Sequence, residues 1–146
     1  MQYLSLGIIL FMILEFSNIL FLYFKPESKS SNSMGVFNAY ERSKADPEIH
    51  RLVKYLVNWV AGTKLILIAV LLVILVLGDF TTKMIALIAL IISVLAFFWR
   101  LFPIAREMDK MGELIPRGHS KSLGLMVIGS IVILFVALQL ALILKG

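Results

Sequence analysis

The chain of 146 residues contains no cysteine. This absence excludes disulfide bonds, thiol redox chemistry and metal centres with cysteine ligands. Histidine is also scarce, because His50 and His119 are the only two and they lie in separate polar segments. Two such residues without a nearby carboxylate motif predict no metal site.

The familiar catalytic patterns are missing as well. We find no serine–histidine–aspartate arrangement, no His-Glu-x-x-His and no paired catalytic carboxylates. Gly124 and Gly129 have the glycine spacing of a phosphate loop but lack its Lys-Ser/Thr. The first apolar segment has no basic start and no small-residue cleavage site, and it carries Glu15. We therefore expect a retained membrane span there, not a signal peptide.

Apolar residues, in contrast, are abundant: they make up 60% of the chain, and the mean hydropathy is +0.97. A soluble domain of this size would expose too much apolar surface. Four runs reach the roughly 20 residues that a helix needs to cross a bilayer. Because lipid offers no partners for backbone groups, each span must be helical, and the alternation of a membrane β-strand is absent. The predicted fold is all-α, a four-transmembrane-helix bundle forming one integral membrane domain over 1–146, with spans at about 3–24, 52–77, 82–101 and 123–144.

Lysine and arginine gather in two segments, 25–51 and 102–122, and at the adjoining span ends. The positive-inside rule predicts that both segments are cytoplasmic and that both termini lie outside. A nucleic-acid surface would also be basic, but here acids are interleaved and the cations flank apolar spans. We expect the lipid bilayer as a partner and no nucleic acid.

Several local patterns predict where the helices begin and end. Asp46-Pro47-Glu48 is typical of a helix start, and the pattern from there to Leu77 would be ~45 Å long. The third helix should continue to Gly112, with a kink at Pro103, and Ser120 should cap the fourth. Helices two and three are thus predicted to extend into the cytoplasm. The amphipathic stretch 35–43 either lies on the membrane surface or packs against the span ends.

Lys64 lies inside an apolar run, where a charge costs at least ~2.5–3.5 kcal/mol and needs a partner or a function. Counting from the predicted outer ends of the spans, Glu15 is ~21 Å deep and Lys64 is ~22 Å deep. Asn18 is one helical turn from Glu15, and Ser93 and Ser130 fall near the same level, at ~18 and ~21 Å. We predict an intramembrane polar layer formed by Glu15, Asn18, Lys64, Ser93 and Ser130. It is either a buried ion pair that sets helix register or a site for a proton, an ion or a polar ligand.

A second polar set lies at the predicted cytoplasmic ends of the spans. This basic rim consists of His50, Arg51, Lys54, Asn58, Arg100 and Arg106. Such residues suit an anionic head group or a phosphate-bearing cofactor. Topology alone also accounts for them, because positive residues belong at that interface whatever the protein does.

The segment 46–58 reads DPEIHRLVKYLVN. It resembles the entrance to the second helix in the membrane-associated eicosanoid and glutathione metabolism (MAPEG) family. The resemblance implies a trimer of four-span subunits and glutathione bound at the subunit interface by an arginine, an asparagine and a glutamate of helix two. Asn58 would match the asparagine, and Lys54 would replace a basic neighbour. Ala61 stands where the family has the acid, and Val57 stands where it has the arginine.

Three hypotheses of function follow. The leading one is a non-enzymatic subunit or ligand-binding module built around the polar layer, present as a homo-oligomer or as part of a larger membrane complex. The second is a MAPEG-like membrane enzyme that acts on lipophilic substrates, with glutathione as cofactor only in this case. The third is a small transporter or proton pathway that uses Glu15 and Lys64. The sequence leaves the choice open, and with it whether the protein is an enzyme.

Overall fold

The computed structural model describes residues 1–29 and 32–144. The regular elements among them are all helical, as predicted. In chain order they are α1 (Gln2–Phe24), the 3₁₀ turn η1 (Met34–Val36), α2 (Asn38–Ser43), α3 (Pro47–Leu77), α4 (Phe80–Leu95), α5 (Phe97–Lys110) and α6 (His119–Ile143).

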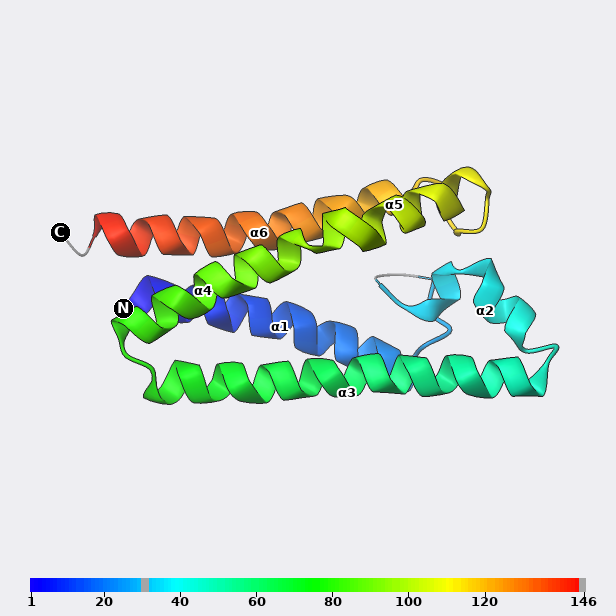
Figure 1. Cartoon of the computed structure of the whole chain (residues 1–146), viewed down its shortest axis with the longest axis horizontal. Helices are drawn as coiled ribbons and strands as arrows, with labels where there is room; N and C mark the ends of the chain where they lie inside the picture. The colour runs from blue at the N-terminus through cyan, green and yellow to red at the C-terminus, as the bar shows by residue number, and fades with distance from the viewer. Residues whose placement is uncertain (30–31, 145–146) are drawn as a thin grey trace.

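Within the described residues, four helical segments are long and apolar enough to cross a membrane: α1, α3, α4 together with α5, and α6. Figure 1 shows them running along the long axis of the molecule, with α1 between α3 and α6. Met1, the α3–α4 turn and the last turn of α6 lie at one end, which we call the terminal end. The segments 25–29, 32–46 and 111–118 lie at the opposite end, which we call the loop end.

Helix α3 begins and ends where the sequence predicts. The Asp46 carboxylate accepts hydrogen bonds from the backbone N–H groups of Glu48 (2.9 Å) and Ile49 (3.2 Å), and Pro47 occupies the first helical position. These contacts satisfy N–H groups that have no partner within the helix. With 31 residues, against 23 in α1, α3 is longer by ~12 Å and extends past α1 at the loop end (Figure 1).

The segment after α1 fills the space beyond its end. Val36 and Tyr40 are buried there, and α2 contacts α3. Backbone hydrogen bonds from Asn38 N to Glu113 O (2.9 Å) and from Ile115 N to Val36 O (2.8 Å) join this segment to the α5–α6 turn. Of the two expectations for the amphipathic stretch, packing against the protein is the one that the structure shows.

The third span differs from the prediction. It is interrupted at Ala96, about two helical turns before Pro103, and Pro103 lies inside α5. The break falls where the rings of Phe97, Phe98 and Phe102 contact one another, with centroids 5.3–6.0 Å apart. All three rings belong to α5, so these contacts are local to the first turns of that helix. The end at Gly112 is as predicted: Gly112 has φ +72 and the hydrogen bonds of a Schellman cap.

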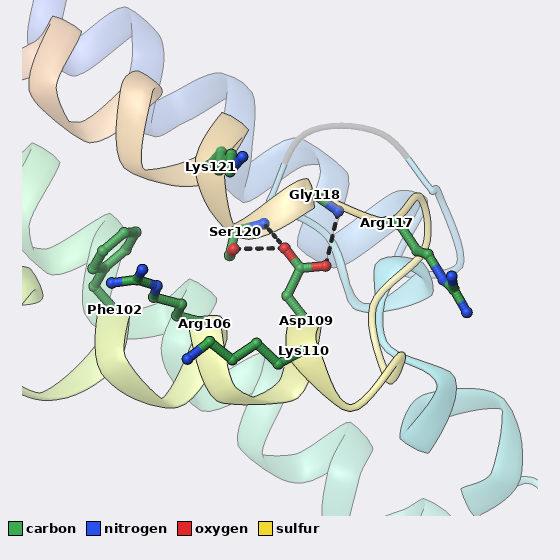
Figure 2. Close-up of a pocket in the computed structure, with 8 residues that line it drawn as sticks. All are labelled: Phe102, Arg106, Asp109, Lys110, Arg117, Gly118, Ser120 and Lys121. Carbon is green, nitrogen blue, oxygen red and sulfur yellow. Dashed lines mark hydrogen bonds between the residues drawn. The ribbon is translucent and has the colours of Figure 1, made fainter.

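The start of α6 also corrects the prediction, because Ser120 is not its N-cap. Gly118, with φ +84, is the cap, and a carboxylate from α5 satisfies the first turn. Asp109 accepts from Gly118 N (2.8 Å), Ser120 N (3.1 Å) and Ser120 Oγ (2.5 Å), as Figure 2 shows. The hydroxyl expected to cap its own helix instead donates to the neighbouring helix.

Two apolar clusters hold the long helices together. The first lies toward the terminal end, where Leu4, Ile8, Leu87 and Leu134 are fully buried among α1, α4 and α6. The second joins α1 to α3 toward the loop end and contains Ile19, Leu22, Val57, Ala61 and Ile68. Along α1, Glu15 falls between the two clusters.

Candidate functional site: a charged cluster facing a cavity

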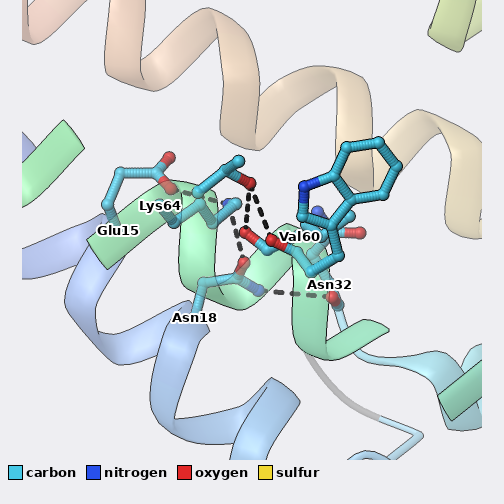
Figure 3. A network of polar contacts seen from close by, with 7 residues as sticks. Glu15, Asn18, Asn32, Val60 and Lys64 are labelled. Carbon is cyan, nitrogen blue, oxygen red and sulfur yellow. Dashed lines mark hydrogen bonds and ion pairs between the residues drawn. The ribbon is translucent and has the colours of Figure 1, made fainter. Parts of the chain in front are cut away.

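Lys64 lies in α3, and its ammonium group reaches α1. Lys64 Nζ is 2.6 Å from Glu15 Oε2 and 2.8 Å from Asn18 Oδ1. Asn18 and Glu15 are three residues apart on α1, so they share one helix face and bracket the ammonium (Figure 3). Three of the five predicted polar-layer residues thus form one cluster.

The cluster is tied to the loop end through Asn18. The Asn18 amide accepts from Lys64 through Oδ1 and donates from Nδ2 to the carbonyl oxygen of Asn32, at 3.2 Å (Figure 3). Asn18 is buried, whereas the side chains of Glu15 and Lys64 are each 24% exposed. The ion pair is therefore packed on one side and open on the other.

The open side faces a cavity of about 470 Å³. One wall is polar and comes from Glu15, Asn18 and Lys64. The opposite wall comes from α4 and α6 and is mainly apolar, formed by Val94, Leu123, Met126, Val127, Gly129, Ser130 and Ile133. This volume is within the usual range of small-molecule sites, which combine apolar walls with a few polar groups.

The two predicted serines lie apart from the ion pair. Ser130 lines the cavity on the α6 wall, and its hydroxyl donates to Met126 O at 3.1 Å. Ser93 is exposed on α4 and is not among the residues that line the cavity. Matching depths thus predicted the contact between α1 and α3 correctly. Depth alone does not specify which face of α4 or α6 a serine occupies.

The predicted basic rim does not form one site. His50, Arg51, Lys54 and Asn58 follow one another along α3, whereas Arg100 and Arg106 belong to α5. Two of the six are engaged locally: the Asn58 amide donates to Lys54 O at 2.8 Å, and Arg100 lies 5.3 Å from the ring of Trp99. Arg106 lines a different cavity, between α5 and α6.

His50 belongs to the packing of the loop end. Its Nδ1 is 2.9 Å from Ser43 Oγ, and because that hydroxyl donates its one hydrogen to Tyr40 O, Nδ1 of His50 is the donor. Lys44 also lies at the loop end and binds Glu27 at 2.9 Å. This hydrogen bond lowers the pKa of the Glu27 carboxyl. Burial raises the pKa of Tyr40.

Sequence reasoning missed a second lysine inside the bundle. Only 5% of Lys83 is exposed, and its Nζ donates to Ser5 Oγ at 3.1 Å. Ser5 is four residues from Met1, and Lys83 is four residues from Asp79. The depth count that matched Glu15 with Lys64 would therefore have found this contact too.

The arrangement can bind a polar group at one wall of the cavity. An ammonium, a carboxylate and an amide can together donate and accept hydrogen bonds at one cavity wall. Toward the terminal end, the buried cluster of Leu4, Ile8, Leu87 and Leu134 separates this wall from Lys83.

Comparison with known protein families, with characterised proteins and with solved structures finds no match for this chain.

Proposed function

We propose that this protein is a four-span integral membrane protein that binds an amphiphilic molecule in the cavity between α1 and α6. The ligand's polar end would contact Glu15, Asn18 and Lys64, and its apolar body would lie against α4 and α6. The observation that carries the proposal is an ion pair that lines a cavity between apolar helices.

Unused hydrogen-bonding capacity supports this proposal. Lys64 can donate three hydrogen bonds, and in the described part of the chain it makes two, to Glu15 and Asn18. The Glu15 carboxylate uses one oxygen for Lys64, although it can accept several bonds. A pair that served only to set helix register would gain nothing from facing a cavity with these sites free.

We also propose that the loop end is cytoplasmic, since Lys and Arg are concentrated there. The loop-end parts of α3 and α5 would then extend out of the bilayer. The exposed apolar residues of α3, such as Ile66, Val73 and Val76, would contact lipid or a second copy of the chain. We propose in addition that the protein is present as a homo-oligomer or as part of a larger membrane complex.

The test is native mass spectrometry of the protein released from membranes, with Gly129→Leu as the blocking variant. A side chain at Gly129 would start in open space on the cavity wall, so leucine should fill the cavity without a clash. Ala69→Leu is the matched control, because Ala69 is exposed on α3. We expect the wild type and Ala69→Leu to retain a small amphiphile and Gly129→Leu to lose it, and the same spectra count the subunits.

Retention of the same adduct by Gly129→Leu, or a wild type that carries none, would show the proposal to be wrong. The glutathione alternative stays a prediction and is tested in the same spectra by adding glutathione. Asn58 and Lys54 are exposed on α3 and do not line the cavity, so Asn58→Ala should abolish glutathione binding and leave the amphiphile in place. The apolar core toward the terminal end favours binding over a conducting pathway.

A further inference from the structure

A second cavity, of about 400 Å³, lies between α5 and α6 where the two helices meet at the loop end. Four cations line it: Arg106 and Lys110 from α5, and Arg117 and Lys121 from the turn and the start of α6. Figure 2 shows Arg106 and Lys110 on one side of Asp109 and Arg117 on the other. The turn between the two helices brings the cations of α5 to the same cavity as those of the turn and α6.

The one acid in this cavity is already engaged. Both oxygens of Asp109 accept hydrogen bonds from the first turn of α6. Within the described residues, the ion pairs join other side chains: Arg42 with Glu113, Lys44 with Glu27 and Glu41, and Lys64 with Glu15. The four cations therefore surround the cavity without a carboxylate partner in the part of the chain that the structure describes.

The wall of the cavity is fixed in place by a close contact. Phe102 lines it and packs over Gly124 of α6, where an added Cβ would lie 2.9 Å from the Phe102 ring. The ring holds α5 and α6 together beneath the cations and supplies one apolar surface. Trp99 and Arg100, one turn before, are exposed, as is typical of residues at a membrane interface.

We propose that this basic cavity binds a phosphate group, either that of an anionic phospholipid or free phosphate. Arginine suits phosphate because its planar fork donates two parallel hydrogen bonds, and lysine adds a point charge. Basic pockets between spans at the cytoplasmic side bind anionic head groups in the same way. This site is separate from the cavity at Glu15 and does not depend on that proposal.

The experiment titrates the detergent-solubilised protein with phosphatidylglycerol, with phosphatidylcholine and with inorganic phosphate, and measures adducts by native mass spectrometry. The test variant is Arg106→Gln/Lys110→Gln. The control is Lys25→Gln/Lys29→Gln, which removes the same charge from exposed positions after α1. Lys121→Gln tests the α6 side independently, and thermal unfolding checks that each variant is folded.

We expect the wild type to bind phosphatidylglycerol in preference to phosphatidylcholine. The test variant should lose about 30-fold in affinity, roughly fivefold per cation near an anionic head group, and the control should bind like the wild type. Inorganic phosphate that binds alone, with the same variant dependence and no preference between the lipids, would identify free phosphate as the ligand. Equal loss in test and control variants, or no binding by the wild type, would overturn the proposal.

Discussion

Lys64 has its charge balanced by two groups of different kinds. Glu15 supplies an opposite charge at 2.6 Å, and Asn18 supplies a neutral acceptor at 2.8 Å. A lone lysine at this depth would cost at least ~2.5–3.5 kcal/mol, and a lone glutamate would face a similar penalty. Because Asn18 remains when Glu15 is changed, the lysine should tolerate the loss of its partner better than the glutamate does.

The first prediction is that Glu15 and Lys64 are energetically coupled. Glu15→Gln and Lys64→Met should each lower thermal stability in detergent, because each leaves one charge without its partner. Breaking such a pair costs on the order of 3–5 kcal/mol in soluble proteins, and the loss should be smaller here because both side chains are 24% exposed. Lys64→Met should be the more damaging, and the double variant should recover much of the loss.

A double-mutant cycle measured by thermal unfolding checks this prediction. Ser93→Ala is the control, since Ser93 is exposed and lies apart from the pair, and it should leave stability unchanged. A double variant whose loss equals the sum of the two single losses would mean that the residues are not coupled. Each charge would then have another partner, such as an ion, a ligand or a second subunit.

For single residues, the sequence predicts a contact wherever the rise per residue along each helix is enough to determine it. Counting residues located Glu15, Asn18 and Lys64 correctly, because α1 and α3 pack side by side. The same count was not applied to Lys83, although this residue falls at the start of the predicted third span. The basic cavity was beyond such a count, because the turn between α5 and α6 brings Arg106 and Lys121 to the same cavity and no periodicity specifies a turn.

Among the elements, α5 and α6 are tied together by Asp109. Its carboxylate takes the place of an N-cap for α6, although Asp109 and Ser120 are eleven residues apart. Hydrogen bonds to a charged group contribute more than neutral ones do. The carboxylate therefore fixes the angle at which α6 leaves the turn and with it the shape of the basic cavity.

The second prediction concerns this tie. Asp109→Ala should lower the stability of the protein in detergent by about 1–3 kcal/mol, because it leaves backbone and hydroxyl donors of α6 without their acceptor. Glu107→Ala removes an acid from an exposed position of the same helix and should have little effect. Equal unfolding temperatures for the two variants would contradict the role assigned to Asp109.

A glycine sets the crossing of α1 and α6. A Cβ placed on Gly7 would lie 2.6 Å from the Cβ of Ala137, which is too close for two methyl groups. Neither atom is at the end of a flexible side chain, so the helices themselves would have to separate. The crossing thus depends on one position in α1 that the spacing of glycines in the sequence did not single out.

The third prediction follows from that contact. Gly7→Ala should destabilise the protein by roughly 1–3 kcal/mol through overpacking. Adding Ala137→Gly should restore most of the loss, since the methyl group then moves from one helix to the other. Gly129→Ala is the control, because a Cβ there meets nothing within 4 Å. Thermal unfolding in detergent measures all three variants, and a double variant no better than Gly7→Ala would contradict the prediction.

Helix boundaries were predictable where the capping residues are local. Asp46 and Pro47 adjoin α3 in the chain, so the start of that helix could be read directly. The start of α6 depends on Asp109, and the break at Ala96 lies two turns from Pro103. The start of α6 therefore depends on a contact with another helix, which explains why the local sign at Ser120 was misleading.

Across the whole molecule, polar and apolar levels alternate along the long axis. The loop end is closed by α2, η1 and the α5–α6 turn, which are joined by the bridge between Phe37 and Leu114 and by Asn38 Nδ2 donating to Gly112 O at 3.0 Å. Next come the α1–α3 cluster, the charged cluster with its cavity, and the apolar core toward the terminal end. Both proposed binding sites therefore lie on the loop-end side of that core. The side of the membrane on which the loop end lies then decides which lipids and solutes can reach them.

The fourth prediction is that the loop end is cytoplasmic. All lysines and arginines except Lys64, Lys83 and Lys145 lie in the predicted cytoplasmic segments or at the adjoining span ends, and such a bias sets orientation. The chain has no cysteine, so single cysteines can be placed at three exposed positions: Ala39 in α2, Met111 after α5 and Thr81 beside the α3–α4 turn. A membrane-impermeant maleimide added to intact cells should label Thr81→Cys and should label the other two only after permeabilisation. Labelling of Ala39→Cys or Met111→Cys in intact cells would reverse the assignment, and the basic cavity would then face the outer leaflet, away from the anionic lipids of the cytoplasmic leaflet.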